Sequence, residues 1–444
     1  MQSSKTDDDI QADATQAKES AHSSKTPRPT QPSDSMSAAQ PNPHPDTPGP
    51  TRSLLALASG AFILGAAEFV MMGILPQAAA ATSVSIPVAG HYISAYAFGV
   101  CAGTLMLVFG RRIPPRNLIV LFMAIALIGN LGSALSTGQI MLLAARFVSG
   151  LPHGAFFGTA TLIARTLAPR GKEARSVSMM VTGQTVANML GVPAGTLLAE
   201  VVSWRCAFLL LAAWAAMTIM LTIAWIPRVP PIKDAGIKGQ FAFLKHPGPW
   251  FVIVAVFGGN TGLFCWWSYV SPWLQTVGGW PSALVPALMV LAGLGMVIGG
   301  IAGGRLTDRW APGGTAALSQ FIGMIGLLLV FVTPNTRPVT AVLTFVVAFS
   351  MFFNSSPQQL LMVQVGAGGG ELIAGAAVQV AYNFGNAMGS VIGGAALTET
   401  AMNYHSIGLA GAPFTAAAAI LLAVFFHRYE HRRSALERLE HVDV

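Results

Sequence analysis

The sequence predicts an all-α integral membrane protein whose twelve transmembrane helices form two pseudo-symmetric bundles of six. Only 10% of its 444 residues are charged, against roughly 25% in an average soluble domain. Apolar runs of about 20 residues recur along the chain, and each can cross a hydrocarbon core about 30 Å thick as a helix. Lipid offers backbone groups no partner, and these long runs do not alternate, so helices are favoured over the strands of a barrel.

Polar residues divide the apolar sequence into twelve expected spans. They lie near residues 54–80, 89–109, 117–135, 139–164, 177–199, 206–226, 250–276, 283–304, 315–333, 339–363, 373–397 and 406–427. The long, proline-rich segment 228–248 is expected to be a cytoplasmic linker between an N-terminal bundle at 52–227 and a C-terminal bundle at 249–427. Residues 1–51 are rich in Ser, Thr, Pro, Gln and Asp, which predicts a disordered cytoplasmic tail without a cleaved signal. A cytoplasmic C-tail is expected at 428–444.

Lysine and arginine residues predict the orientation of the spans. With the N-terminus inside, 22 of the 25 fall on the cytoplasmic side, whereas Arg205 and Arg337 lie outside and Arg146 lies within a span. Positively charged loops stay in the cytoplasm. Both termini are therefore expected to be cytoplasmic in an inner membrane of bacterial type. The net charge of +7 reflects this topology rather than a surface for nucleic acid.

Three local patterns occur in both halves of the chain. "GTLMLVFGRR" from Gly103, which ends in Arg111 and Arg112, corresponds to "GRLTDRWAPG" from Gly304, which contains Asp308 and Arg309. Prolines interrupt spans four and ten, and spans five and eleven each contain a Gln-x-x-x-Asn pair. These patterns together indicate a duplicated six-helix unit, a plan that recurs in transporters with a central binding site.

The segments "AAEFVMMGILP", "LAARFVSGLPHGAFFG", "GQTVANMLGVPAG" and "GRLTDRW" resemble the major facilitator superfamily over residues 52–427. Within it they are most similar to twelve-span drug:proton antiporters of the arabinose-efflux type. The resemblance implies the major facilitator fold, with spans one, four, seven and ten around a cavity that opens alternately to either side. Related permeases are associated with sugars, purine nucleosides and antibiotics such as chloramphenicol.

Two motifs depart from the family pattern. Leu107 and Val108 replace the acid and the first base that usually follow span two, whereas Asp308 and Arg309 retain them in the second half. The antiporter signature of span five, normally G-P-x-x-G-G, is matched only in part by Gly191, Pro193 and Gly195. The resemblance therefore supports the superfamily more strongly than it supports antiport.

Glu68 is the one charged residue between Ser53 and Ala81. A charge at mid-bilayer is costly and usually points into the protein or a wet cavity. At about 1.5 Å per residue, Glu68 in span one and Arg146 in span four reach nearly the same depth. Two interpretations stay open. One is a fixed ion pair with Arg146, and the other is a proton-carrying carboxyl, because burial disfavours its charge and a nearby cation favours it.

His153 shares a face of span four with Arg146 and is a second proton candidate, because histidine titrates near neutrality. Its alternative role is a hydrogen bond to a backbone carbonyl beside Pro152. Gly150 and Gly154 form a small-residue stripe that allows close helix packing. The glycines of spans five and eleven are interpreted in the same way, as contact or hinge surfaces.

Uncharged polar and aromatic side chains are the candidates for substrate contact, since rings supply flat apolar surface and amides orient hydrogen bonds. They are Asn260, Phe264, Trp266, Trp267 and Tyr269 in span seven, Asn354, Gln358 and Gln359 in span ten, and Gln184, Asn188, Gln379 and Asn383 in spans five and eleven. The alternatives are interfacial anchoring for the tryptophans and hydrogen bonds between helices for the amides.

The sequence thus predicts a secondary transporter that exports a small organic molecule or drug, in exchange for protons. No nucleotide-binding G-x-x-x-x-G-K-[ST] motif occurs, and no cofactor, metal or nucleic-acid partner is expected. The soluble segments offer no nucleophile with a base, so an enzyme is not expected, and we expect a monomer in the bilayer. The alternatives are facilitated export of a sugar or nucleoside, with Glu68 purely structural, and a receptor or scaffold that does not transport.

Overall fold

A computed structural model describes residues 50–110, 112–169, 172–228, 242–332, 334–365 and 371–430. All of these residues belong to one compact unit, Pro48–Val444, and its regular elements in the described ranges are helices. Parts of the expected tails and linker lie outside the described residues, namely 1–49 of the tail expected at 1–51, 229–241 of the linker and 431–444 of the C-tail, and so does Arg111. Residues 50 and 51 of the expected tail belong to the first helix instead.

The helices account for the twelve expected spans. The first half contains α2 (Pro50–Ala81), α3 (Ile86–Ala89), α4 (His91–Gly103), α5 (Met106–Gly110), α6 (Pro115–Ala134), α7 (Gln139–Gly150), α8 (Pro152–Thr166), α9 (Glu173–Val186), η2 (Ala187–Gly191), α10 (Val192–Val201) and α11 (Trp204–Trp225). The second half contains η3 (Ala242–Lys245), α13 (Pro247–Trp267), α14 (Val270–Thr276), η4 (Ser282–Leu284), α15 (Val285–Arg309), α16 (Pro312–Val332), α17 (Arg337–Phe353), α18 (Ser355–Val365), α19 (Glu371–Glu399), α20 (Ser406–Phe425) and η5 (Phe426–Glu430).

Length and hydropathy alone identify nine membrane-crossing helices in the described part of the chain. The three other expected spans fall on α4 with α5, on α9 with η2 and α10, and on α19. Two of these three are broken into shorter helices. The break in span five is a π-turn, η2, directly before Val192 and Pro193, the first two residues of α10, and such π-turns interrupt α-helices mostly at functional positions.

The two halves repeat one pattern of helix packing. In the first half, α2 packs on α9 and α11, while α4 packs on α7. In the second half, α13 packs on α19 and α20, while α15 packs on α17. Because these are the corresponding spans of each half, the packing agrees with the duplicated unit that the sequence patterns predict.

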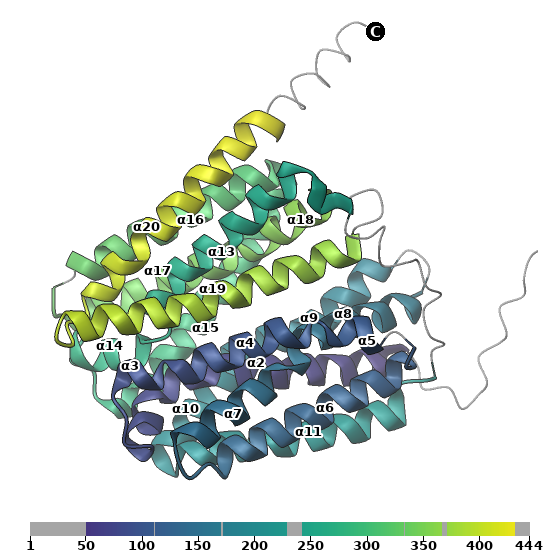
Figure 1. Cartoon of the computed structure of the whole chain (residues 1–444), viewed down its shortest axis with the longest axis horizontal. Coiled ribbons are helices and arrows are strands. Elements are labelled where there is room, and N and C mark those ends of the chain that lie inside the picture. Colours follow the sequence, from purple (N-terminus) through teal and green to yellow (C-terminus); the bar gives the residue numbers. More distant parts are fainter. Residues whose placement is uncertain are drawn as a thin grey trace, which may run out of the picture. The chain divides into compact units, whose positions relative to one another are not determined.

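Two seams join the halves. One lies between α4 and α19, which run side by side in Figure 1, and the other lies between α15 and the η2–α10 segment. In the first seam, Ser94 Oγ donates to the carbonyl of Ala387 at 2.9 Å, and Ser390 Oγ donates to the carbonyl of Gly90 at 2.8 Å. In the second seam, Ser282 Oγ donates to Glu200 Oε1 at 2.6 Å. These bonds lie toward the end of the helices where α2 ends and α4 begins, which we call the distal end.

The two arginines that charge counting places outside the membrane anchor loops at the distal end. Arg205 stacks 4.5 Å from the Trp204 ring and donates to the carbonyl of Ser136 at 2.8 Å. Arg337 lies 5.6 Å from the Trp280 ring and donates to the carbonyl of Gly279 at 2.9 Å. Each arginine thus ties its own loop to a neighbouring loop, which gives it a structural role.

The glycine stripes lie where helices approach most closely. A Cβ on Gly150 would overlap the carbonyl oxygen of Tyr96 in α4, and one on Gly103 would overlap the carbonyl oxygen of Leu151. In α19, a Cβ on Gly385 would lie 2.7 Å from the carbonyl oxygen of Phe257 in α13. Backbone against backbone leaves no room for a side chain, so these glycines have the packing role that the stripes predict.

Candidate functional site

A cavity of about 110 Å³ lies between the two halves of the helical unit. It is lined by Glu68, Phe69, His153, Gln184, Asn260, Phe264, Met351, Phe352, Ser355, Gln359, Gln379, Tyr382, Asn383 and Asn386. These residues come from spans one, four, seven and ten, as the family resemblance implies, and also from spans five and eleven. Gln359 is exposed, whereas Glu68 and Asn386 are buried. The cavity therefore extends inward to the carboxylate from the side opposite the distal end.

One wall of the cavity is aromatic. The Phe69 ring lies 6.2 Å from the rings of Phe264 and Phe352, measured between centroids. Trp267 lies at the same distance behind Phe69, outside the lining. Rings at such separations pack in tilted or edge-to-face arrangements and hold one another in place. The wall therefore presents a fixed apolar surface to a ligand.

Most of the polar side chains that line the cavity are amides. Gln379, Asn383 and Asn386 follow one face of α19, with spacings of four and three residues, and Gln184 and Asn260 add two more. Asn383 Nδ2 donates to the carbonyl of Gln379 at 3.1 Å, while its Oδ1 has no partner among the described residues. Such a mixture of an apolar wall and a few polar groups is typical of sites for small organic molecules.

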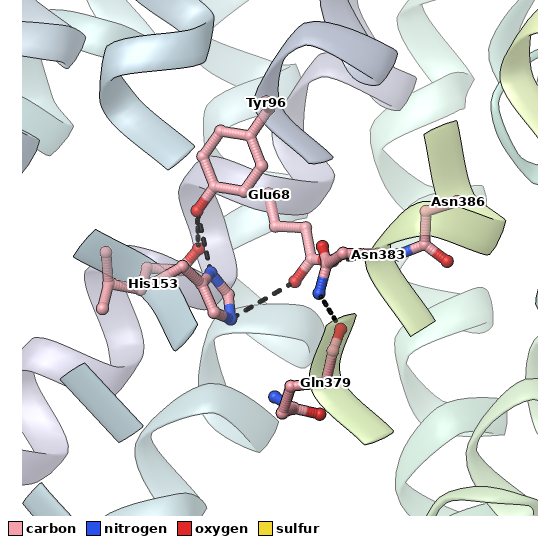
Figure 2. A network of polar contacts seen from close by, with 7 residues as sticks. Glu68, Tyr96, His153, Gln379, Asn383 and Asn386 are labelled. Carbon is pink, nitrogen blue, oxygen red and sulfur yellow. Dashed lines mark hydrogen bonds and ion pairs between the residues drawn. The ribbon is translucent and has the colours of Figure 1, made fainter. Parts of the chain in front are cut away.

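Glu68 lies at the inner end of the cavity with only 7% of its surface exposed. Its Oε1 accepts a hydrogen bond from Asn386 Nδ2 at 3.2 Å, and its Oε2 lies 3.7 Å from His153 Nε2. Figure 2 shows the carboxylate between these two side chains, which approach it from opposite halves of the chain. Helix α2 positions the carboxylate there because its apolar residues are packed on all other sides.

Arg146 is not the direct partner of Glu68 in the described residues, so the ion pair, one of the two interpretations left open for Glu68, is not formed in this structure. Its guanidinium is fully buried, stacks 4.4 Å from the centre of the Tyr96 ring, and donates from Nε to the carbonyl of Tyr92 at 3.4 Å. Tyr96 of α4 holds the cation instead. The position nearest the carboxylate is taken by His153, two turns further along span four.

Tyr96 controls which nitrogen of His153 carries a proton. Its hydroxyl donates to the carbonyl of Leu64 at 3.1 Å and lies 2.9 Å from His153 Nδ1. A hydroxyl has a single proton, so while it donates to Leu64 it can only accept from Nδ1–H. His153 Nε2 and Glu68 then share one further proton, either as imidazolium and carboxylate or as neutral imidazole and carboxylic acid.

The second tautomer arises when the Tyr96 hydroxyl turns to His153. It then donates to Nδ1, and the imidazole presents Nε2–H to the Glu68 carboxylate. The three side chains can therefore hold a proton at Glu68 or at His153 without any change of backbone. This arrangement supports reversible proton binding better than a fixed guanidinium–carboxylate pair would.

The structure brings eight of the predicted proton-site and cavity residues to this cavity. They are Glu68, His153, Gln184, Asn260, Phe264, Gln359, Gln379 and Asn383. The remaining predicted cavity residues, Asn188, Trp266, Trp267, Tyr269, Asn354 and Gln358, are buried elsewhere.

Helix rotation and helix breaks explain these differences. Asn188 lies in the π-turn against Gly293 of α15, and Tyr269 lies in the break after α13, where its hydroxyl donates to the carbonyl of Ser390 at 2.7 Å. Asn354 lies in the break between α17 and α18. In α18 the cavity is lined by Ser355 and Gln359, and Gln358, the residue before Gln359, lies outside this lining.

Several lining residues were missed by sequence reasoning. Asn386 lies seven residues after Gln379 and three after Asn383, so helical periodicity could have placed it on the same face. Phe69, Met351 and Phe352 carry no such signal, because apolar residues are common on every face of a membrane helix.

The residues predicted for conformational motifs lie away from the cavity. Gly150, Gly154 and Gly103 pack against neighbouring helices, as do Gly191 against Phe62 and Gly195 against Val70. Pro193 starts α10. Arg112, Asp308 and Arg309 are exposed at helix ends, and Gly304 faces Ser356 with room for a side chain.

Comparison with known proteins identifies the family to which this chain belongs. The family description "Major Facilitator Superfamily" matches residues 57–370. The chain is also 38% identical over 384 residues to AraJ of Escherichia coli (strain K12), which covers 86% of this chain and 96% of AraJ. The chain belongs to the Major Facilitator Superfamily. The all-α fold of twelve membrane helices in two six-helix bundles, and the arabinose-efflux-type resemblance, are confirmed.

Other relatives agree with this assignment. YdhP of Escherichia coli (strain K12), named an inner membrane transport protein, is 34% identical over 373 residues, which are 83% of this chain and 94% of YdhP. YfhI of Bacillus subtilis (strain 168), named an MFS-type transporter, is 30% identical over 372 residues, 84% of this chain and 93% of YfhI. This major facilitator protein is therefore a multi-pass membrane transporter of small molecules rather than an enzyme.

A solved structure shares the fold. A bacterial homologue of the human lysosomal transporter Spinster, in an inward-facing and unoccupied conformation, superposes with a TM-score of 0.61. The match covers 84% of this chain and 94% of the other at 15% identity, so it shows the common fold alone.

Proposed function

We propose that this major facilitator protein is a secondary active transporter that exports a small organic solute across the cytoplasmic membrane in exchange for protons. One observation carries the proposal. Glu68 lies at the inner end of a cavity between the halves, beside a histidine and an amide instead of a fixed cation. A carboxylate without a permanent counter-ion can be neutralised by a proton, and intramembrane carboxylates of this kind mark proton pathways.

The orientation follows from the charge distribution. Cytoplasmic termini place the distal end, with its hydrogen-bonded seams, on the outer side and the exposed side chain of Gln359 toward the cytoplasm. The described arrangement then corresponds to a cavity open to the cytoplasm and closed to the outside. Export begins with a solute entering from the cytoplasm and contacting the aromatic wall and the amides of α19.

Proteoliposomes with a pH gradient test this proposal. Chloramphenicol, a purine nucleoside and a pentose would each be offered as labelled solutes to vesicles that are acidic inside. Antiport predicts uptake against the solute gradient, and with one proton per solute a difference of one pH unit supports about tenfold accumulation. An uncoupler should abolish the accumulation.

Other results would contradict the proposal. Uptake that stops at equal concentrations and ignores the uncoupler would favour facilitated export of a sugar or nucleoside. No flux of any solute in vesicles that contain folded protein would favour a receptor or scaffold.

Tyr96→Phe is expected to slow proton-driven transport by about tenfold, because a lost buried hydrogen bond costs about 1–1.5 kcal/mol. The variant removes the hydroxyl that sets the tautomer of His153 and keeps the ring under Arg146. Initial rates of pH-driven uptake would be compared with solute exchange at equal pH, which should change little.

Tyr92→Phe provides the matched control for Tyr96→Phe. Tyr92 lies one turn earlier in α4, and its hydroxyl donates to Thr82 Oγ1 at 2.8 Å, away from His153. An equal loss of pH-driven uptake in both variants would contradict a special role for Tyr96.

A further inference from the structure

We propose that Asn386 couples the protonation of Glu68 to the opening and closing of the distal end. The inference rests on the proposed function, because it assumes that Glu68 is the proton site. Asn386 is a positioning residue: it acts on the alternation of the cavity through its bond to Glu68.

The geometry of Asn386 links the two halves at the proton site. Its side chain is 5% exposed on α19, and its Nδ2 donates to Glu68 Oε1 of α2 at 3.2 Å. Its Oδ1 is buried and has no hydrogen-bond partner among the described residues. The amide is thus satisfied on one side only, beside a group that changes its protonation state (Figure 2).

An amide can bond to either form of a carboxyl group, but not equally well. In the charged form, Nδ2–H donates to the carboxylate, and charge-assisted bonds are about twice as strong as neutral ones. When a proton from water binds Glu68, a flipped Asn386 can accept from the new O–H through Oδ1, which is free for it. The flip exchanges the Nδ2–H bond to Oε1 for this O–H bond to Oδ1; the proton later returns to water, and no other covalent bond is made or broken. Protonation therefore weakens the tie between α2 and α19.

The same segment of α19 holds the distal end closed. Ala387, the next residue, accepts from Ser94 Oγ of α4 at 2.9 Å. Ser390, one turn further, donates to the carbonyl of Gly90 at 2.8 Å. A shift of α19 away from α2 and α4 thus breaks the Glu68 bond and the seam together, while a charged Glu68 holds both in place.

Tyr382 of α19 also lines the cavity, but its hydroxyl donates to the carbonyl of Ser355 at 3.4 Å. The other titratable and charged groups near Glu68 among the described residues belong to the first half. They are His153 of α8, Tyr96 of α4 behind it, and Arg146 of α7, which stacks on Tyr96. These groups influence where the proton resides, but they move with Glu68 when the halves separate. Asn386 differs from them because it lies on the other half.

Spin labels at the distal end can test this coupling without a substrate. Cysteines at Ser85 and Thr400, both exposed on opposite halves, would be labelled in full-length protein whose Cys101, Cys206 and Cys265 are replaced by alanine. Distances would be measured between pH 5 and pH 9 in lipid nanodiscs. Because the tie weakens from a charge-assisted to a neutral bond, we expect the ratio of open to closed populations to rise about fivefold at low pH.

Asn386→Leu and Asn386→Ala should remove this pH dependence, and Glu68→Gln should remove it too. Two Asn386 variants are used because leucine fills the space of the amide and alanine adds no bulk. Asn130→Leu is the matched control, since Asn130 is also a buried amide but lies outside the cavity and bonds to the carbonyl of Ala126 within α6. It should keep the pH response of the unchanged protein.

The outcomes separate this inference from the proposed function. One outcome is that the distances in Glu68→Gln stay constant with pH while those in both Asn386 variants change as in the unchanged protein. That result overturns the coupling role of Asn386 and leaves the proton site in place. If Glu68→Gln itself responds normally, the proton site of the proposed function fails. If the distances in both Asn386 variants do not change with pH and those in Asn130→Leu do, the inference is supported.

Discussion

Glu68→Gln is expected to abolish solute accumulation driven by a pH gradient and to leave solute exchange at equal pH largely intact. Glutamine has the shape of glutamic acid and can still accept from Asn386 through Oε1, as Glu68 does at 3.2 Å. It cannot bind and release a proton. The cavity should therefore still hold its ligand and still alternate, while the exchange loses its link to the proton gradient.

The measurement compares two assays on the same vesicles. With one proton per solute, a gradient of one pH unit supports about tenfold accumulation in the unchanged protein, and the ratio should fall to about one in Glu68→Gln. Glu68→Asp is the control, because it keeps a titratable carboxyl and shortens its stem by one methylene, so it should retain part of the accumulation. Undiminished pH-driven uptake in Glu68→Gln would show that the proton is carried elsewhere.

The depth of a residue in the membrane was predictable from the sequence only to within about two helical turns. Counting 1.5 Å per residue brings Glu68 to nearly the depth of Arg146, whereas the structure places His153, seven residues further along span four, beside the carboxylate. The division into halves was also predictable, because local patterns repeat in corresponding spans. Both predictions depend on position along a helix axis, which the sequence states directly.

The rotation of each helix about its axis was much less predictable. Arg146 and His153 share a face of span four, but Leu151 separates α7 from α8, which begins at Pro152, and only His153 reaches Glu68. Gln184 lines the cavity, while the π-turn that begins at Ala187 carries Asn188 toward α15. Breaks of this kind depend on packing between helices, so regular spacing fails at the broken spans and works on the continuous α19.

Gly150→Val is expected to destabilise the protein severely. Gly150 ends α7 where that helix crosses α4, and any Cβ there would overlap the carbonyl oxygen of Tyr96. A backbone atom cannot turn aside as a flexible side chain can, so α4 itself must move. Overpacking typically costs about 1–3 kcal/mol and occasionally more, and valine adds two further methyl groups. The displaced α4 would also move Tyr96 away from His153.

Alanine substitutions along the glycine stripe test this explanation, because the expected loss of stability differs from one glycine to the next. A Cβ at Gly154 lies 2.9 Å from Thr104 Oγ1, and one at Gly158 lies 3.1 Å from a terminal methyl of Leu107, both of them side-chain atoms that can move. The loss in thermal unfolding temperature should therefore decrease from Gly150→Ala to Gly154→Ala to Gly158→Ala. Gly300→Ala is the control, because a Cβ there meets nothing within 4 Å and alanine favours the helix by about 1 kcal/mol over glycine. Equal losses at all four positions would mean that helix flexibility, and not the close approach of α7 and α8 to α4, explains the glycines.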